Sequence, residues 1–133
     1  MIQSILLLSI VGLILNLAFS DAQIQPDWSL ALLLGALLAH RAYWPWVFAG
    51  TALHDLVLHW SPFVTLPWMM LAPLLMIWSD AQAGASLVQR FVIMILIIMN
   101  LWVWYWPLQA VVLTLLLTTV IWYIVAQKHA QPV

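Results

Sequence analysis

The side chains best suited to chemistry lie close together in residues 47–60, VFAGTALHDLVLHW, where His54, Asp55 and His59 follow a small, apolar run. The pattern predicts a helix, with Phe48, Asp55 and His59 on one face of it. Asp55 precedes His59 by four residues, the favourable orientation for an ion pair on a helix. The simplest interpretation is a self-compensating pair or a hydrogen bond between helices. The chemical alternative is an ion or proton path, and the rest of the chain is then the bundle around this helix.

An ion or proton path needs further ionisable residues at a similar depth, and the sequence supplies few. Asn16 and Asn100 are the main candidates, and they are more simply explained as hydrogen bonds between helices. Haem ligation by two of His40, His54 and His59 is a second chemical alternative. His40 and His59 are expected at opposite ends of the bundle, so they cannot serve one haem. We therefore predict no cofactor, no metal and no catalytic residue.

The composition indicates an integral membrane protein. Hydrophobic residues make up 67% of the chain and charged residues 5%, and the mean hydropathy is +1.11, whereas about 25% of a soluble domain is charged. The formal net charge of -1 argues against nucleic-acid binding. The sequence has no cysteine and no glutamate, which excludes thiolate chemistry and disfavours a carboxylate-rich metal site. We expect a protein that is not an enzyme.

Apolar segments separated by short polar or proline-containing turns predict an all-α membrane protein, a compact bundle of about six transmembrane helices. The predicted helices cover residues 2–20, 28–39, 44–60, 63–79, 90–105 and 108–126. Spans of about 17–20 residues consume nearly the whole chain, so residues 1–133 form a single domain with short loops. Five spans remain open if the second helix is partly interfacial. The first segment is expected to be an uncleaved span rather than a signal peptide, because no basic residue precedes it.

Polar residues and prolines mark the expected helix boundaries. Asp27, after Pro26, is predicted to cap the second helix. Within that helix Gly35 belongs to a stripe of small residues at four-residue spacing, which lets another helix approach closely. Pro67 and Pro73 are predicted to kink the fourth helix.

The three basic residues predict the orientation in the membrane. With six spans, Arg41, Arg90 and Lys128 all fall on one side, which the positive-inside rule makes cytoplasmic. Both termini are then cytoplasmic as well. Many tryptophans fall at predicted helix ends, as in an aromatic belt; they are Trp28, Trp44, Trp46, Trp60, Trp78, Trp104 and Trp106.

Two short segments resemble the MreD family of bacterial rod shape-determining proteins. In QPDWSL, Pro26 and Trp28 resemble the family's Pro-x-Trp-type start of an early helix. In FAGTALHDL, the residues Phe48, Gly50 and Asp55 resemble its Phe-x-x-Gly-x-x-x-Asp-type helix, with the phenylalanine and glycine one position closer together here. The compact six-helix layout is also similar.

The resemblance implies a non-catalytic scaffold of the cell-shape and peptidoglycan elongation complex, the elongasome, with several passes through the bacterial inner (cytoplasmic) membrane. The implied partner is an MreC-like bitopic protein, and through it MreB, a RodA-type glycosyltransferase and a class B penicillin-binding protein, besides membrane lipid. Asp55 and Gly50 would then fix the packing of the third helix against neighbouring helices or a partner. The other packing candidates are Phe48, His54, His59, Pro26, Trp28 and Gly35.

The alternative function is a small-molecule-binding membrane subunit of a transporter. The layout also resembles the six-helix substrate-binding subunits of energy-coupling-factor vitamin transporters. A pocket would then be lined by the kinked fourth helix and by His59, Trp60 and Trp68.

Overall fold

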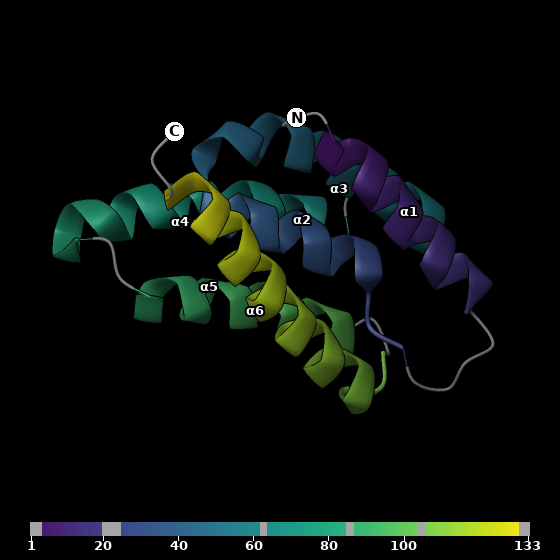
Figure 1. Ribbon diagram of the computed structural model, residues 1–133. Helices are drawn as coiled ribbons and strands as arrows, with labels where there is room; N and C mark the ends of the chain where they lie inside the picture. Colours follow the sequence, from purple (N-terminus) through teal and green to yellow (C-terminus); the bar gives the residue numbers. More distant parts are fainter. Residues whose placement is uncertain (1–3, 20–24, 62–63, 85–86, 104–105, 131–133) are drawn as a thin grey trace.

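The computed structural model describes residues 4–19, 25–61, 64–84, 87–103 and 106–130, and these ranges contain helices and no strand (Figure 1). The prediction of an all-helical chain is therefore confirmed. In chain order the elements are α1 (Ser4–Ala18), α2 (Trp28–Ala39), the short 3-10 helix η1 (Arg41–Tyr43), α3 (Trp44–His59), α4 (Leu66–Ala83), α5 (Leu87–Val103) and α6 (Leu108–Ala130).

The helix at the centre of the bundle is α2, not α3 as the sequence suggested. α2 contacts α1, α3, α5 and α6, and Figure 1 shows it in the middle of the molecule. Its leucines Leu30, Leu33, Leu34 and Leu37 are fully buried. α2 lacks ionisable residues, so its central position reflects uniform apolar character on all sides rather than any site-like feature.

Glycines set how closely two helices approach α2. A Cβ atom at Gly35 would lie 2.7 Å from Cγ2 of Ile121 and 3.1 Å from the backbone nitrogen of Trp122, both on α6. A Cβ atom at Gly12 of α1 would lie 2.9 Å from Cα of Ser29. The close approach predicted for the small residues of α2 is thus confirmed at Gly35, and α6 is the helix that approaches it.

The fourth helix begins and ends later than predicted, at Leu66 and Ala83 instead of residues 63 and 79. Pro67 lies in its first turn, where a proline needs no hydrogen-bond partner, so the predicted kink at Pro67 is wrong. Only Pro73 lies inside the helix, where it lacks the N–H that would bond to the carbonyl of Met69. The helix then continues through Asp80 and ends at Ala83, and the C-cap residue Gly84 has a φ of 79°.

The outer surface of the bundle is apolar, unlike that of a soluble bundle. Large apolar side chains are exposed along α1, α4, α5 and α6, and the buried set, which is mostly apolar, also contains several polar or charged side chains. Exposed examples are Leu7, Leu74, Leu96 and Leu116, and buried polar examples are Asn16, Asp27, Thr51, His54 and Asp55. An apolar exterior of this extent marks a surface that another apolar medium or a partner covers.

Helix length gives a narrower statement about membrane spans. Within the described residues, 108–127 form the one helical stretch that is both long and apolar enough to cross a membrane. Helices α1, α2 and α5 are apolar but shorter.

Candidate functional site

The site begins with Asp27, which caps α2 as predicted. Its Oδ1 accepts a hydrogen bond from the backbone N–H of Leu30 (3.1 Å). Its own N–H donates to Oγ1 of Thr114 on α6 (2.9 Å). Asp27 is fully buried, so the cap also attaches the start of α2 to α6.

His54 of α3 bridges two carboxylates. Its Nε2 lies 2.6 Å from Oδ2 of Asp27, and its Nδ1 lies 2.9 Å from Oδ1 of Asp55. All three side chains have no exposed surface. We call this set, Asp27, His54 and Asp55, the carboxylate–histidine cluster.

Asp55 extends the cluster to α4. Its Oδ2 accepts hydrogen bonds from the backbone N–H groups of Thr65 (2.7 Å) and Leu66 (2.9 Å). Thr65 is the N-cap residue of α4, but its own side chain makes no capping bond. A carboxylate on a neighbouring helix therefore supplies the cap that the local sequence does not.

The charge of the cluster follows from its geometry. Both ring nitrogens of His54 face carboxylate oxygens, so two bridging protons are needed. An imidazolium between two carboxylates satisfies this, and so does a neutral imidazole with one protonated carboxyl group. Either way the cluster carries a net charge of about -1, which the N-termini of α2 and α4, at roughly +0.5 each, offset.

The alternative of a hydrogen bond between helices is confirmed for Asp55, and an ion pair with His59 is not among its described contacts. The carboxylate of Asp55 contacts its sequence neighbour His54 and the first N–H groups of α4 instead. Both oxygens of Asp55 are engaged by these contacts, Oδ1 by the ring of His54 and Oδ2 by the two N–H groups. The ring of His59 lies 5.8 Å from that of His54, centroid to centroid.

The two asparagines join helices, as predicted. Nδ2 of Asn16 on α1 donates to the carbonyl of Pro26 (3.1 Å), and its Oδ1 accepts from the N–H of Ser29 (3.4 Å). Nδ2 of Asn100 on α5 donates to the carbonyl of Val64 (3.2 Å), just before α4. Asn16 therefore ties α1 to the same end of α2 that the carboxylate–histidine cluster occupies.

The remaining sequence candidates lie around this cluster or along α2. A Cβ atom at Gly50 would lie 2.7 Å from Cδ2 of Leu33 and 3.3 Å from Oγ of Ser9, so α1, α2 and α3 meet there. Phe48 packs, partly buried, against the core. Trp28 is half-buried in the first turn of α2, and its indole Nε1 has no hydrogen-bond partner.

All three side chains of the cluster are fully buried. The surface cavities among the described residues include four whose linings do not contain Asp27, His54 or Asp55. Both nitrogens of His54 are engaged, so it could ligate haem only by giving up a carboxylate contact. The described residues contain no group of three or more His, Cys, Asp or Glu placed to hold a metal ion.

The transporter alternative expects a pocket lined by His59, Trp60 and Trp68. Trp60 is 90% exposed and Trp68 is 45% exposed. None of the same four cavities is lined by His59, Trp60 or Trp68.

Comparison of the chain with protein-family models, with curated proteins and with solved structures finds no match.

Proposed function

We propose that this chain is a non-catalytic integral membrane scaffold of the MreD type, which crosses the bacterial inner membrane several times and binds an MreC-like bitopic partner. The observation that carries the proposal is the use made of its ionisable residues. The carboxylate–histidine cluster holds α2, α3 and α4 together through its hydrogen bonds. None of the four cavities described above is lined by Asp27, His54 or Asp55. Such an arrangement favours a structural over a catalytic role.

The membrane part of the proposal is supported by the exposed apolar side chains of α1, α4, α5 and α6. Arg41 and Arg90 line one cavity and so lie at one end of the bundle. The carboxylate–histidine cluster lies at the other end, where α2 and α4 begin. The positive-inside rule then makes the arginine end cytoplasmic, with both termini on that side.

The MreD part is supported by where the two resembling segments meet. QPDWSL contributes Asp27 and FAGTALHDL contributes His54 and Asp55, and these residues form one buried network. Gly50, from the second segment, packs against Leu33 of α2, the helix that begins within the first segment. Of the residues that carry the resemblance, Gly50 therefore lies where α3 packs against α2, and Asp55 belongs to the buried network.

The test is gentle isolation of the tagged protein from the membranes of its native host, followed by identification of what co-purifies. We expect an MreC-like bitopic protein together with cell-wall synthases. The Asp55→Leu variant should recover less of them, while Leu56→Ala, at an exposed neighbouring position, should recover the normal amount. An ATPase pair with a coupling subunit in place of these partners would overturn the proposal.

A further inference from the structure

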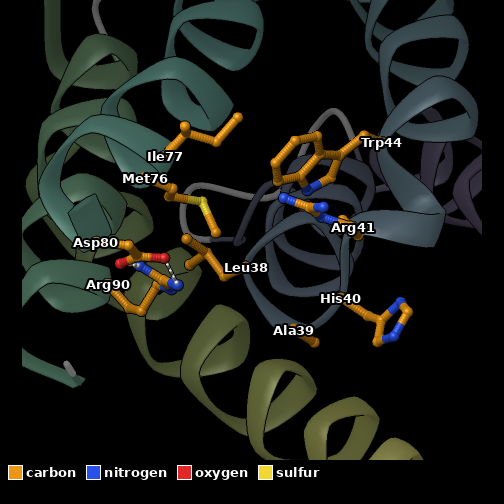
Figure 2. A pocket seen from close by; sticks show the side chains of 9 residues that line it. All are labelled: Leu38, Ala39, His40, Arg41, Trp44, Met76, Ile77, Asp80 and Arg90. Atoms are coloured by element: carbon orange, nitrogen blue, oxygen red, sulfur yellow. Dashed lines mark hydrogen bonds and ion pairs between the residues drawn. The ribbon is translucent and has the colours of Figure 1, made fainter. Parts of the chain in front are cut away.

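A cavity of about 210 Å³ lies at the arginine end, between the α2–α3 corner and the facing ends of α4 and α5. Figure 2 shows Arg41 and Trp44 on one side of it and the Asp80–Arg90 pair on the other. Leu38 and Met76 lie between these two sides. The side chain of His40, at the rim, points away.

The two arginines of this cavity are in different electrostatic situations. Arg90 donates to both carboxylate oxygens of Asp80, at 2.9 Å each. This hydrogen bonding lowers the pKa of Asp80, which sits at the polar end of α4 beyond its apolar run, so the pair stays ionised and mutually neutralised. The guanidinium of Arg41 lies 5.5 Å from the centroid of the Trp44 ring, and among the described residues no carboxylate is paired with it. The lining of the cavity therefore has one uncompensated positive charge.

A second cavity adjoins the first. It measures about 520 Å³ and is lined by Arg41, Trp44, Pro45, Phe48 and Ile77, so the two cavities share Arg41, Trp44 and Ile77. Apart from Arg41 its lining side chains are apolar or aromatic. Ile77 is 48% exposed, and so the groove between α3 and α4 opens on the outer, apolar face of the bundle.

We propose that these two cavities form a binding site for one anionic phospholipid, with its phosphate on Arg41 and an acyl chain along the groove of Phe48 and Ile77. A cation joined to an apolar groove matches an amphiphile with an anionic head and a hydrocarbon tail. Basic pockets between transmembrane helices on the cytoplasmic side bind such head groups. A tryptophan beside the arginine matches the interfacial level at which head groups lie.

The site rests on the membrane placement given under Proposed function, but on no feature of MreD-type assembly. A soluble phosphate ester shares the head-group chemistry, yet it would leave the apolar groove without an occupant. A phospholipid uses both cavities, and this is why we assign the site to a lipid.

The test measures lipid binding to the detergent-solubilised full chain by native mass spectrometry. The probes are dioleoylphosphatidylglycerol, dioleoylphosphatidylcholine and sn-glycerol 3-phosphate. We expect phosphatidylglycerol to bind more tightly than phosphatidylcholine by about fivefold, the ratio to which about 1 kcal/mol per basic residue near an anionic surface corresponds. Glycerol phosphate should bind far more weakly than phosphatidylglycerol.

Two pairs of variants locate the site. Arg41→Gln should abolish the preference for phosphatidylglycerol, whereas Lys128→Gln, which removes the same charge at the end of another helix, should keep it. Ile77→Asn should weaken the binding of both lipids. Leu74→Asn, a turn earlier on α4 and 63% exposed, should weaken the binding of neither. The melting temperature of each variant shows that it is folded, and the exposed positions of Arg41, Leu74 and Ile77 favour that.

Equal affinity for the two lipids, equal effects of Arg41→Gln and Lys128→Gln, or glycerol phosphate binding as tightly as phosphatidylglycerol would each overturn the lipid site. A carbonate wash of membranes from the native host separates this failure from a failure of the proposed function. If the protein stays in the washed membranes with its partners, the proposed function stands without the lipid site. If the wash releases the protein, the proposed function and the lipid site are both overturned.

Discussion

His54 holds the bundle together through both of its ring nitrogens. A single imidazole separates two carboxylates that come from different parts of the chain, Asp27 before α2 and Asp55 within α3. In a fully buried setting each partner is stabilising only while the other two are present, because an unpaired buried charge is costly. Substitutions in this cluster should therefore have large and strongly coupled effects.

Asp55→Leu should destabilise the folded protein by about 3–5 kcal/mol. The change leaves His54 with one partner and leaves the N–H groups of Thr65 and Leu66 without an acceptor. The measurement is unfolding in mixed detergent micelles, with the exposed Leu56→Ala as control. If Asp55→Leu lowers the free energy of unfolding no more than the control does, Asp55 does not hold His54 and the start of α4 as described.

A double-mutant cycle separates the observed contact from the pair expected on helical spacing. Asp27→Asn and His54→Gln should show a coupling energy of about 1–3 kcal/mol, because the two side chains are in direct contact at 2.6 Å. The parallel cycle of Asp55→Asn with His59→Gln should give a smaller coupling energy, because the described hydrogen bonds of the Asp55 carboxylate go to His54 and to the start of α4. A larger coupling energy in the second cycle than in the first would show that Asp55 pairs with His59 instead.

At the scale of elements, α2 is a short helix that its neighbours enclose. Its twelve residues extend for about 18 Å, and its fully buried leucines leave little surface for contact with lipid. Two glycines, Gly35 within it and Gly12 on α1, let the neighbouring backbones approach. The stability of the bundle therefore depends on how closely α6 and α1 reach α2.

Gly35→Ala should destabilise the protein by about 1–3 kcal/mol, the usual cost of overpacking. The new Cβ would lie 2.7 Å from Cγ2 of Ile121 and 3.1 Å from the backbone nitrogen of Trp122. Adding Ile121→Ala should recover only part of the loss, because the backbone contact persists. The readout is the unfolding midpoint in detergent; a Gly35→Ala protein as stable as the parent would show that α6 does not approach α2 this closely.

For the whole molecule, the distribution of charge and apolar surface defines two ends and a belt. The arginine end contains Arg41, Arg90 and Asp80, and the opposite end contains the carboxylate–histidine cluster. Exposed apolar side chains lie between them on the outer helices. This polarity gives the proposed membrane orientation a direct experimental test.

Single cysteines can report the orientation, since the chain has none of its own. In intact spheroplasts a membrane-impermeant thiol reagent should label Trp60→Cys, at the 90% exposed C-cap of α3. It should not label Gln82→Cys, which is exposed near the arginine end of α4. Lysis should make both equally reactive. Labelling of Gln82→Cys but not Trp60→Cys before lysis would invert the orientation.

Local features of the sequence determined the helices. Six apolar stretches bounded by prolines, aspartates and short polar turns predicted six helices, and the bounds of α2 and the cap by Asp27 were correct. Caps and apolar runs are encoded within a few residues, and so they can be recognised without the fold. Pro67 was misjudged because whether a proline lies at a helix start or inside it depends on where the preceding loop ends.

The tertiary structure alone decided which polar groups meet. Nothing in residue spacing links Asp27 to His54, 27 positions away, or Asp55 to the N–H groups that open α4. Helical periodicity assigned Asp55 to His59, whereas the packing of α4 against α3 brings the first N–H groups of α4 to the Oδ2 of Asp55. The same holds for the proposed lipid site, since Arg41 of η1 and Ile77 of α4 share a groove only because α3, which follows η1, packs beside α4.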